Sequence, residues 1–222
     1  MTPPSRFERV LALSGLAVTG ALLVSAIGAW TEHATNVRIA AVEAASAAQL
    51  TPAQRVAALK YEAEVARRRT ERAEAIHGYS ASYGISPELS ASIYDIARAE
   101  GIRPSIAYRL VQVESNFKRT ARSSAGALGL TQIQVGTARQ YDKSVTTERL
   151  MERDLNLRLG FRYLKDLLVQ FDHDSHLALL AYNRGPGRVE EILAEGGNPR
   201  NGYSSAVLKA YRPTAPARGV AN

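Results

Sequence analysis

The stretch LVQVESNFKRTARSSAGALGLTQIQVGTA spans residues 110–138 and places a glutamate where a helix gives way to a loop. The segment that begins at Pro104 carries apolar residues at Ile106, Leu110 and Val111, which is the spacing of one buried helical face. Glu114 lies four residues after Leu110 and three after Val111, so it borders that face. Because Gly and Ser dominate the following residues, the helix is expected to end close to Glu114.

The position of Glu114 disfavours its ionised form. Partial burial beside the apolar face removes water from the carboxylate. The unpaired carbonyl groups of the last helical turn add partial negative charge. Both effects predict a raised pKa, which suits a carboxylic acid that donates a proton near neutral pH. On position alone, a solvated glutamate at the edge of a helix is the alternative.

Helical patterns continue on both sides of this stretch. Ser86-Pro87-Glu88 predicts the start of a helix that runs to about Glu100, where Gly101 ends it. Five further helices are predicted, over residues 131–141, 149–171, 175–183, 187–194 and 202–211. No alternating run of four or more β-branched residues indicates a sizeable sheet. The sequence therefore predicts an all-α domain over residues 81–212, followed by a disordered tail over residues 213–222.

The N-terminal segment has the character of a membrane anchor. Residues 10–30 carry no charge and, as a helix, are long enough to cross a hydrocarbon layer of roughly 30 Å. Arg6 and Arg9 precede the segment, so the positive-inside rule places the rest of the chain outside the cytoplasm. A cleaved signal peptide is the alternative, with Ala26-Ile27-Gly28 as its small-residue site. We expect residues 1–31 to anchor the chain as a single-pass protein of the inner membrane, with its catalytic domain in the periplasm.

Residues 32–80 are rich in alanine and in charged side chains. Thr51 and Pro52 have the character of an N-cap and a first helical position. The apolar residues that follow make only an irregular stripe, so a long helix with little to bury is predicted. It would serve as a stalk or linker, pair weakly as a coiled coil, or fray.

The composition limits the classes of site and partner. The chain of 222 residues has a net charge of +7 and a pI near 9.8, which favours an acidic partner such as nucleic acid, anionic lipid or a carboxylate-bearing polymer. It has no cysteine, which excludes disulfides and Cys-based metal or redox sites. The histidines have no ligand-like spacing; they are His33, His77, His173 and His176. We therefore expect no metal and no cofactor.

Three blocks of the sequence share motifs with a known enzyme family. The first has a Glu-Ser pair, an aromatic residue two positions on, a Ser-x-x-Gly-Ala-x-Gly-Leu-x-Gln run and a Thr-Ala pair; its residues are Glu114, Ser115, Phe117, Ser123 or Ser124, Gly126, Ala127, Gly129, Leu130, Gln132, Thr137 and Ala138. The second is NLRLGFRYLKDLLVQF, with Asn156, Gly160, Tyr163 and Leu164. The third is LALLAYNRGPGRV, with Ala181, Tyr182, Asn183, Gly185, Pro186, Gly187 and Val189.

In order and separation, these blocks resemble the lytic transglycosylases with a soluble-lytic-transglycosylase (SLT) type catalytic domain, over about residues 85–212. The resemblance implies a goose-type lysozyme-like helical fold. It implies cleavage of the β-1,4 bond between N-acetylmuramic acid and N-acetylglucosamine in peptidoglycan, with 1,6-anhydromuramyl ends. Glu114 would be the single catalytic acid and then base. The substrate-binding residues it implies are Ser115, Phe117, Ser124, Gly126, Ala127, Gly129, Leu130, Gln132, Tyr163, Tyr182 and Asn183.

The sequence departs from the family pattern at three places. Thr131 stands where the family usually has Met, Gln134-Val135 where it has Met-Pro, and Arg184 where it has Ala. Arg184 adds a cation near the expected cleft, or else is a solvated residue at a helix end. No clear carboxylate partner for Glu114 stands in the matched blocks; the acidic residues available lie in charged stretches with a solvated character and are Asp142, Glu148, Glu152, Asp154, Asp166, Asp172 and Asp174.

Other functions stay open at this stage. A hydrolytic lysozyme on the same fold would use the same glutamate but give reducing-end products. A non-catalytic scaffold that binds the cell wall would have the helical stalk as its main working part. Nucleic-acid binding is indicated by the pI alone, and we do not expect it. The expected partners are peptidoglycan strands, the membrane through the N-terminal helix, and cell-envelope machinery.

Overall fold

The computed structural model describes residues 51–209, and the expected anchor over residues 1–31 and tail over residues 213–222 lie outside them. Within residues 51–209 there is no helix long and apolar enough to cross a membrane. The chain divides into two compact units, Met1–Arg68 and Arg69–Asn222. The border between the two units lies inside the first described helix, which runs from Pro52 to Tyr83. The domain border predicted near Ser80 lies inside the same helix.

That helix is α2, Pro52–Tyr83. Its start is the capping arrangement expected at Thr51: the N–H of Gln54 donates to Thr51 Oγ1 (3.3 Å), and the N–H of Thr51 donates to Gln54 Oε1 (2.8 Å). Val56, Leu59 and Tyr61 are more than half exposed, at 51%, 64% and 72%. This part of α2 therefore matches the expectation of a helix that buries little.

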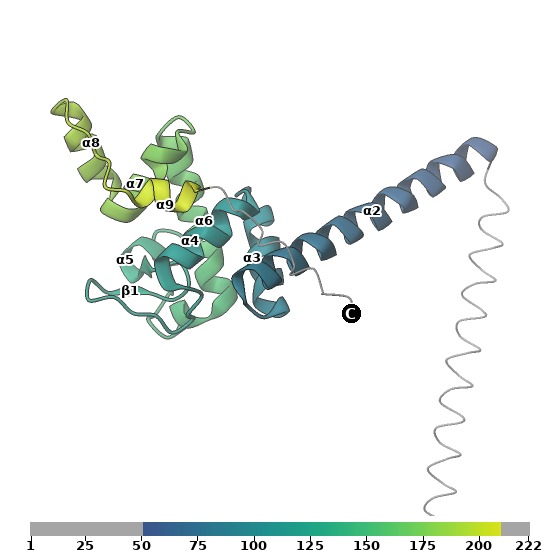
Figure 1. Ribbon diagram of the computed structural model, residues 1–222, viewed down its shortest axis with the longest axis horizontal. Helices are drawn as coiled ribbons and strands as arrows, with labels where there is room; N and C mark the ends of the chain where they lie inside the picture. The colour runs from purple at the N-terminus through teal and green to yellow at the C-terminus, as the bar shows by residue number, and fades with distance from the viewer. Residues whose placement is uncertain (1–50, 210–222) are drawn as a thin grey trace, which may run out of the picture. The chain divides into compact units, whose positions relative to one another are not determined.

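The second unit is mostly helical (Figure 1). Its helices after α2 are α3 (Pro87–Glu100), α4 (Pro104–Ser115), α5 (Val135–Ala138), the 3₁₀ helix η1 (Arg149–Met151), α6 (Arg153–Gln170), α7 (Ser175–Arg184), α8 (Pro186–Ala194) and α9 (Tyr203–Leu208). The start of α3 is as expected: Ser86 Oγ accepts from the N–H of Leu89, and Gly101 ends the helix at a φ of 78°. Pro104 likewise opens α4.

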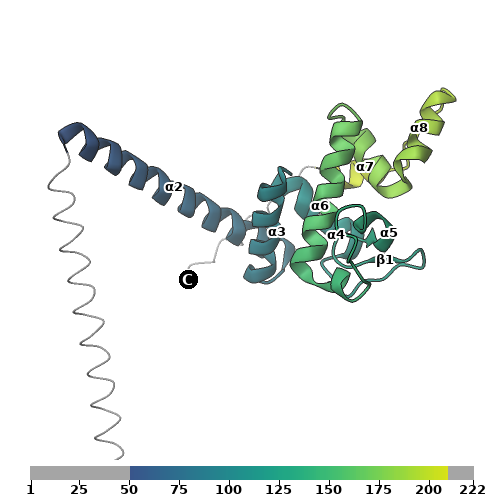
Figure 2. The same cartoon turned by 180° about the vertical axis from the view of Figure 1, so that it is seen from behind.

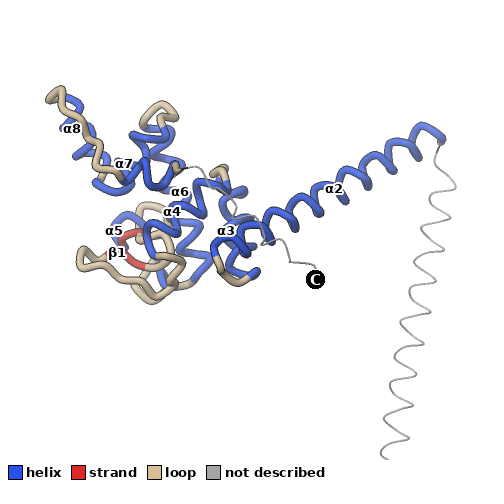
Figure 3. The backbone as a smooth tube through the Cα atoms, in the orientation of Figure 1, coloured by secondary structure: helices blue, strands red, loops and turns tan. Residues whose placement is uncertain are grey.

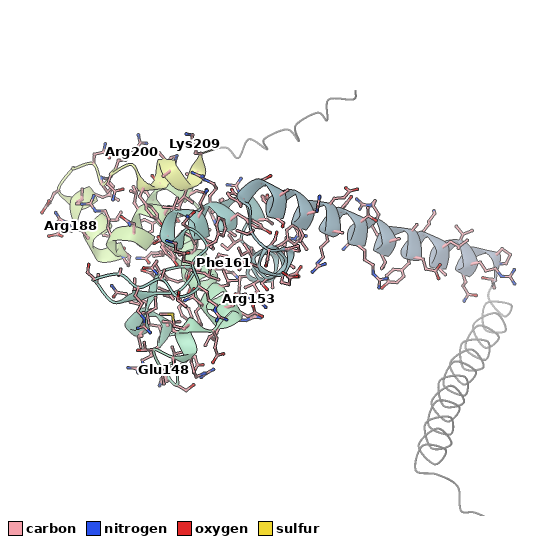
Figure 4. The ribbon with its side chains drawn as sticks, turned by 60° about the horizontal axis from the view of Figure 1, so that its bottom comes forward. Glu148, Arg153, Phe161, Arg188, Arg200 and Lys209 are labelled. Carbon is pink, nitrogen blue, oxygen red and sulfur yellow. The ribbon has the colours of Figure 1, made fainter. Side chains whose placement is uncertain are left out.

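Helix α6 organises the main core. It contacts both α3 and α7, and lies between them when the molecule is viewed from behind (Figure 2). The core cluster contains Leu110 and Val111 from α4 and Phe161 from α6, all without exposed surface. Phe161 lies in the middle of the surrounding helices (Figure 4). At the end of α3, Arg158 and Arg162 of α6 pair with the buried carboxylate of Glu100.

The domain is mostly helical, as the sequence predicts, but the helix predicted from residue 131 needs correction. Residues 131–134 are not helical: β2 (Ile133–Gln134) pairs antiparallel with β1 (Ala127–Leu128), next to α5 (Figure 3). Gly129 and Gln132 have positive φ angles of 74° and 49°, which turn the chain between the two strands. The pairing was missed because two-residue strands carry no alternating pattern to recognise.

Candidate functional site

A cavity of about 470 Å³ opens beside the end of α4. Glu114 lines it from α4, and the β1–β2 region and α5 contribute Ser123, Ala125, Ala127, Gln132, Ile133, Gln134 and Thr137. Tyr163 lines it from α6, and Tyr182, Asn183, Arg184 and Gly185 from the end of α7. The cavity therefore brings together residues from all three sequence blocks. Its size is in the range of small-molecule and sugar-sized sites.

Glu114 occupies the last turn of α4, as the sequence predicts. The helix ends at Ser115, and Asn116 and Phe117 follow with positive φ angles of 48° and 62°. The side chain of Glu114 is half-buried, and this loss of water raises its pKa above the ordinary value of 4.5. The predicted direction of the shift is confirmed, and desolvation is its principal cause.

Tyr203 is the partner of this carboxyl group. It is the first residue of α9, and its phenol donates a hydrogen bond to Glu114 Oε1. This bond favours the ionised form and so opposes part of the rise in the pKa of Glu114. Desolvation and the nearby charge of Glu114 in turn raise the pKa of the Tyr203 phenol, which keeps it a donor. Sequence reasoning missed Tyr203, since no local pattern distinguishes it within the predicted helix over residues 202–211.

The loop between β1 and β2 is fixed by a buried asparagine. Asn156 of α6 accepts from the N–H and Oγ1 of Thr131 (both 2.9 Å) and donates to the carbonyls of Leu128 (2.9 Å) and Leu150 (3.0 Å). Gly129 approaches this side chain so closely that a Cβ atom there would lie 2.3 Å from Asn156 Nδ2. The departure from the family pattern at Thr131 thus supplies a buried hydroxyl that this network satisfies.

The same loop holds Tyr182 at the cavity. The Tyr182 phenol donates to the carbonyl of Thr131 at 2.8 Å, and its ring lies 5.2 Å from that of Tyr163, centroid to centroid. The two aromatic rings thus form one wall beside Glu114. Since Tyr182 is anchored through its hydroxyl group, its ring is held in place before any ligand binds.

Gln132 and Asn183 face the cavity with part of their hydrogen-bonding capacity already used. The amide nitrogen of Gln132 donates to the carbonyls of Gly129 (2.9 Å) and Ala121 (3.2 Å). Its carbonyl oxygen accepts no hydrogen bond from any of residues 51–209, and so can accept an N–H from a ligand. For Asn183 the donors are the available groups: its Oδ1 accepts from Asn201, and its amide N–H groups donate to none of the described residues 51–209.

Several residues predicted to bind substrate do not line the cavity. Leu130 has no exposed surface, and Ser115 is buried with its hydroxyl bonded to the carbonyls of Val111 and Leu130. Phe117 packs against Tyr83, with the ring centroids 5.2 Å apart. Ser124, Gly126 and Gly129 are also absent from the cavity wall, whereas Ser123 contributes to it. These six residues belong to the core or to the loop beside the cavity. The first sequence block therefore contains both residues that line the cavity and residues that hold the surrounding structure.

Glu114 is the sole carboxylate among the described residues that line the cavity. None of the seven acidic residues considered as partners lines the cavity, and four of them have other contacts: Asp142 pairs with Arg149, Asp154 with Arg153, Asp166 accepts from Tyr141, and Asp174 caps α7. Nowhere in residues 51–209 do three or more His, Asp or Glu side chains gather as they would around a metal ion. Among the described residues, the site therefore has one carboxyl group.

Comparison with known proteins shows that the chain is similar to murein and peptidoglycan transglycosylases. The family model described as "Transglycosylase SLT domain" matches residues 92–202, half of the 222-residue chain. The "Soluble lytic murein transglycosylase" of Salmonella typhimurium is 31% identical over 128 residues, covering 55% of this chain and 19% of the relative. "Peptidoglycan transglycosylase gp16" of Escherichia phage T7 is 32% identical over 107 residues, covering 47% of this chain and 8% of the relative. The chain thus corresponds to a fifth or less of each relative's length.

Among solved structures, the lytic transglycosylase Slt of Pseudomonas aeruginosa is similar over 53% of this chain and 22% of that chain, with 31% identity and a TM-score of 0.47. The 70-kDa soluble lytic transglycosylase of Escherichia coli is similar over 53% of this chain and 20% of that chain, with 25% identity and a TM-score of 0.45.

Proposed function

The chain belongs to the transglycosylase SLT domain family, and on this premise we propose that it is a lytic transglycosylase that cleaves the glycan strands of peptidoglycan. The observation that carries the proposal is Glu114: a half-buried carboxyl group with a raised pKa, held by Tyr203, in a cavity with no second carboxylate among its described lining residues. Hydrolytic glycosidases usually employ two carboxylates. A single group favours a reaction in which the substrate supplies the nucleophile.

The proposed reaction begins with Glu114 as an acid. It protonates the glycosidic oxygen between N-acetylmuramic acid and N-acetylglucosamine, and the bond from that oxygen to C1 of the muramyl residue breaks. The acetamido group of the same sugar stabilises the positive charge that develops at C1. The ionised Glu114 then accepts the proton of the muramyl 6-hydroxyl group, whose oxygen bonds to C1. The product is a 1,6-anhydromuramyl end, no water is consumed, and Glu114 regains its proton.

The other residues of the cavity fit a glycan ligand. The available carbonyl oxygen of Gln132 is suited to accept the N–H of an acetamido group, and the free amide donors of Asn183 are suited to sugar hydroxyl groups. The Tyr163 and Tyr182 rings offer an apolar wall against which a sugar ring packs. Of the residues that do not line the cavity, Ser115 and Leu130 are buried and joined by a hydrogen bond, and so fix the end of α4 against the loop before β2.

Product analysis on purified sacculi tests the proposal. The wild-type chain should release muropeptides with anhydromuramyl ends, which mass spectrometry identifies because each is lighter by one water than the hydrolytic product. Glu114→Gln should release none, whereas Glu148→Gln, on an exposed loop before η1 (Figure 4), should release as much as the wild type.

Two other outcomes would replace this proposal. Reducing-end products from the wild-type chain would identify a lysozyme-type hydrolase. Binding of sacculi without any cleavage would identify a wall-binding scaffold. Full activity of the Glu114→Gln variant would show that the assigned chemistry is wrong.

The proposal also includes a location. Peptidoglycan lies outside the cytoplasm, so the domain over residues 81–212 would have to be exported, and the apolar residues 10–30 would provide an uncleaved anchor in the inner membrane. Residues 32–80 would link the two. In membrane fractions the full-length chain should resist carbonate extraction, and added protease should reach the domain only after the outer membrane is opened. A shortened, soluble chain would instead indicate a cleaved signal peptide.

A further inference from the structure

Arg184 brings a positive charge to the same cavity as Glu114. It is the last residue of α7, and it is the sole Lys or Arg among the described residues that line the cavity. Its Nη1 donates to the carbonyl of the buried Pro199 at 2.8 Å, in the segment between α8 and α9. The guanidinium group is therefore held at the cavity wall by the backbone of a second segment.

This guanidinium group has donors to spare. Arginine has five N–H donors, and the contact with Pro199 uses one of them. Within residues 51–209, no carboxylate lies within 4.0 Å of Arg184, whereas Arg153, Arg162 and Arg188 each pair with one. Among residues 51–209 the charge of Arg184 therefore has no paired anion, and its remaining donors are available to a ligand.

We propose that Arg184 determines substrate specificity by binding a carboxylate on the muramyl side of the glycan. The inference rests on the proposed function and deepens it. A planar guanidinium group matches a carboxylate through two parallel hydrogen bonds, and this match favours arginine over lysine for such a ligand. The hydroxyl and acetamido groups of the glycan are neutral, so its carboxylates are the groups that this cation selects.

Peptidoglycan offers that carboxylate from two sources. On strands that carry stem peptides, the lactyl carboxyl group forms an amide and the free carboxylates belong to the peptide. On strands from which an amidase has removed the peptides, the lactyl carboxylate itself is free. Both present the same chemistry next to the muramyl ring, and the two kinds of strand distinguish them.

The test varies the charge at position 184 and the charge on the substrate, and compares the effect of each change on KM and kcat. Arg184→Gln keeps an N–H donor for the Pro199 carbonyl but removes the charge, and Arg184→Lys keeps the charge. Arg188→Gln is the matched control, since Arg188 lies on α8 (Figure 4), pairs with Glu191 and does not line the cavity. Each variant is assayed on three substrates: peptide-bearing strands, peptide-free strands, and peptide-bearing strands whose carboxylates have been converted to primary amides.

We expect Arg184→Gln to raise KM about 5- to 10-fold on the strands that carry the recognised carboxylate, with kcat nearly unchanged, as loss of one partly exposed charge-assisted contact predicts. Arg184→Lys should recover only part of the loss, because it keeps the charge but not the two parallel hydrogen bonds, and Arg188→Gln should match the wild type. On the amidated strands, Arg184→Gln and wild type should be alike if the carboxylate belongs to the peptide. A loss on peptide-free strands would assign it to the lactyl group.

An equal loss on charged and amidated strands, without recovery by Arg184→Lys, would overturn the proposal and leave Arg184 as a structural contact to Pro199. Failure of the proposed function is a separate result, because it appears as the absence of anhydromuramyl products from the wild-type chain. Calorimetric binding of the same strands to Glu114→Gln, with and without Arg184→Gln, makes the charge comparison without turnover. A Kd that does not depend on residue 184 for any strand would also overturn it.

Discussion

The phenol of Tyr203 donates a hydrogen bond to the Oε1 atom of Glu114, although 89 positions separate the two residues in the sequence. The contact exists because α9 packs against α4 and α7, which brings the first residue of α9 over the end of α4. Desolvation raises the pKa of Glu114, and this hydrogen bond opposes part of the rise. Tyr203 thus acts as a positioning residue that also limits how strongly Glu114 holds its proton.

Tyr203→Phe should reduce kcat about tenfold, because one hydrogen bond to a charged group is worth about 1.5–3 kcal/mol. It should also move the alkaline limb of the pH–rate profile to higher pH. The sign follows from the acid step: activity falls as pH rises through the pKa of Glu114, and removing the bond that lowers this pKa raises it. Steady-state rates on peptidoglycan between acidic and alkaline pH measure both effects.

Tyr141→Phe is the matched control for this experiment. It also removes a hydrogen bond to a carboxylate, that of Asp166, but neither residue lines the cavity. Its pH–rate profile should match that of the wild type. An alkaline limb that stays in place in Tyr203→Phe would show that Tyr203 does not tune Glu114.

Glu114→Gln should abolish cleavage and stabilise the folded chain at neutral pH. The pKa of Glu114 is higher in the folded than in the unfolded state, so its contribution to stability is complete below the unfolded value of about 4.5 and is lost as pH rises through the folded value. A neutral amide avoids that loss. Thermal unfolding should show a Tm about 2 °C above the wild type at pH 7.

The difference in Tm between Glu114→Gln and the wild type should disappear near pH 3, well below the unfolded pKa of about 4.5. There the wild-type carboxyl group is protonated in both the folded and the unfolded state, so it no longer opposes folding. If Glu114→Gln were less stable than the wild type at neutral pH, burial would not be the dominant influence on Glu114.

Gly160→Ala should destabilise the protein by about 1–3 kcal/mol, because overpacking a filled core forces side chains and backbone to shift. A Cβ atom at Gly160 would lie 2.3 Å from Thr131 Oγ1 and 2.5 Å from Thr131 Cβ. Activity should fall as well, since the carbonyl of Thr131 holds Tyr182 at the cavity. Urea unfolding gives the stability, and the rate on peptidoglycan gives the activity.

Gly78→Ala is the control for a helical glycine with open space. It lies within α2, and a Cβ atom there meets nothing within 4 Å. Alanine should stabilise the helix by about 0.5–1 kcal/mol. Equal effects of the two substitutions would contradict the close contact between Gly160 and Thr131.

Asn156→Asp should destabilise the protein more at pH 7 than at pH 5. The substitution removes the two donors to the carbonyls of Leu128 and Leu150 and places a carboxylate in a side-chain site with 1% exposure. Burial of an unpaired carboxylate raises its pKa, so lowering the pH protonates it and restores part of the stability. Urea unfolding at several pH values measures the effect.

Asn198→Asp provides the comparison on an exposed loop. Its Oδ1 atom accepts from the N–H of Arg200, and an aspartate can accept the same bond. The free energy of unfolding of the Asn198→Asp variant should differ little from that of the wild type at pH 5 or pH 7. A similar, pH-independent loss in both variants would show that the network around Asn156 does not hold the loop as described.

Local sequence patterns were sufficient for much of the helical framework. The apolar spacing of Ile106, Leu110 and Val111 predicts α4, and Ser86 and Thr51 predict the starts of α3 and α2. Glu114 at the edge of the apolar face predicts its half-buried place and the direction of its pKa shift. These features depend on residues within one or two helical turns of each other, which is why the sequence alone determines them.

The contacts that build the cavity around Glu114, at the end of α4, were determined only by the tertiary structure. Asn156 secures the loop between two strands too short to leave a pattern, and that loop in turn secures Tyr182. Tyr203 reaches Glu114, and Arg184 is anchored by Pro199, through contacts between separate elements. The spacing of apolar residues predicts which face of a helix is buried. Which residues that face contacts depends on how the helices pack, and this packing is a property of the whole folded domain.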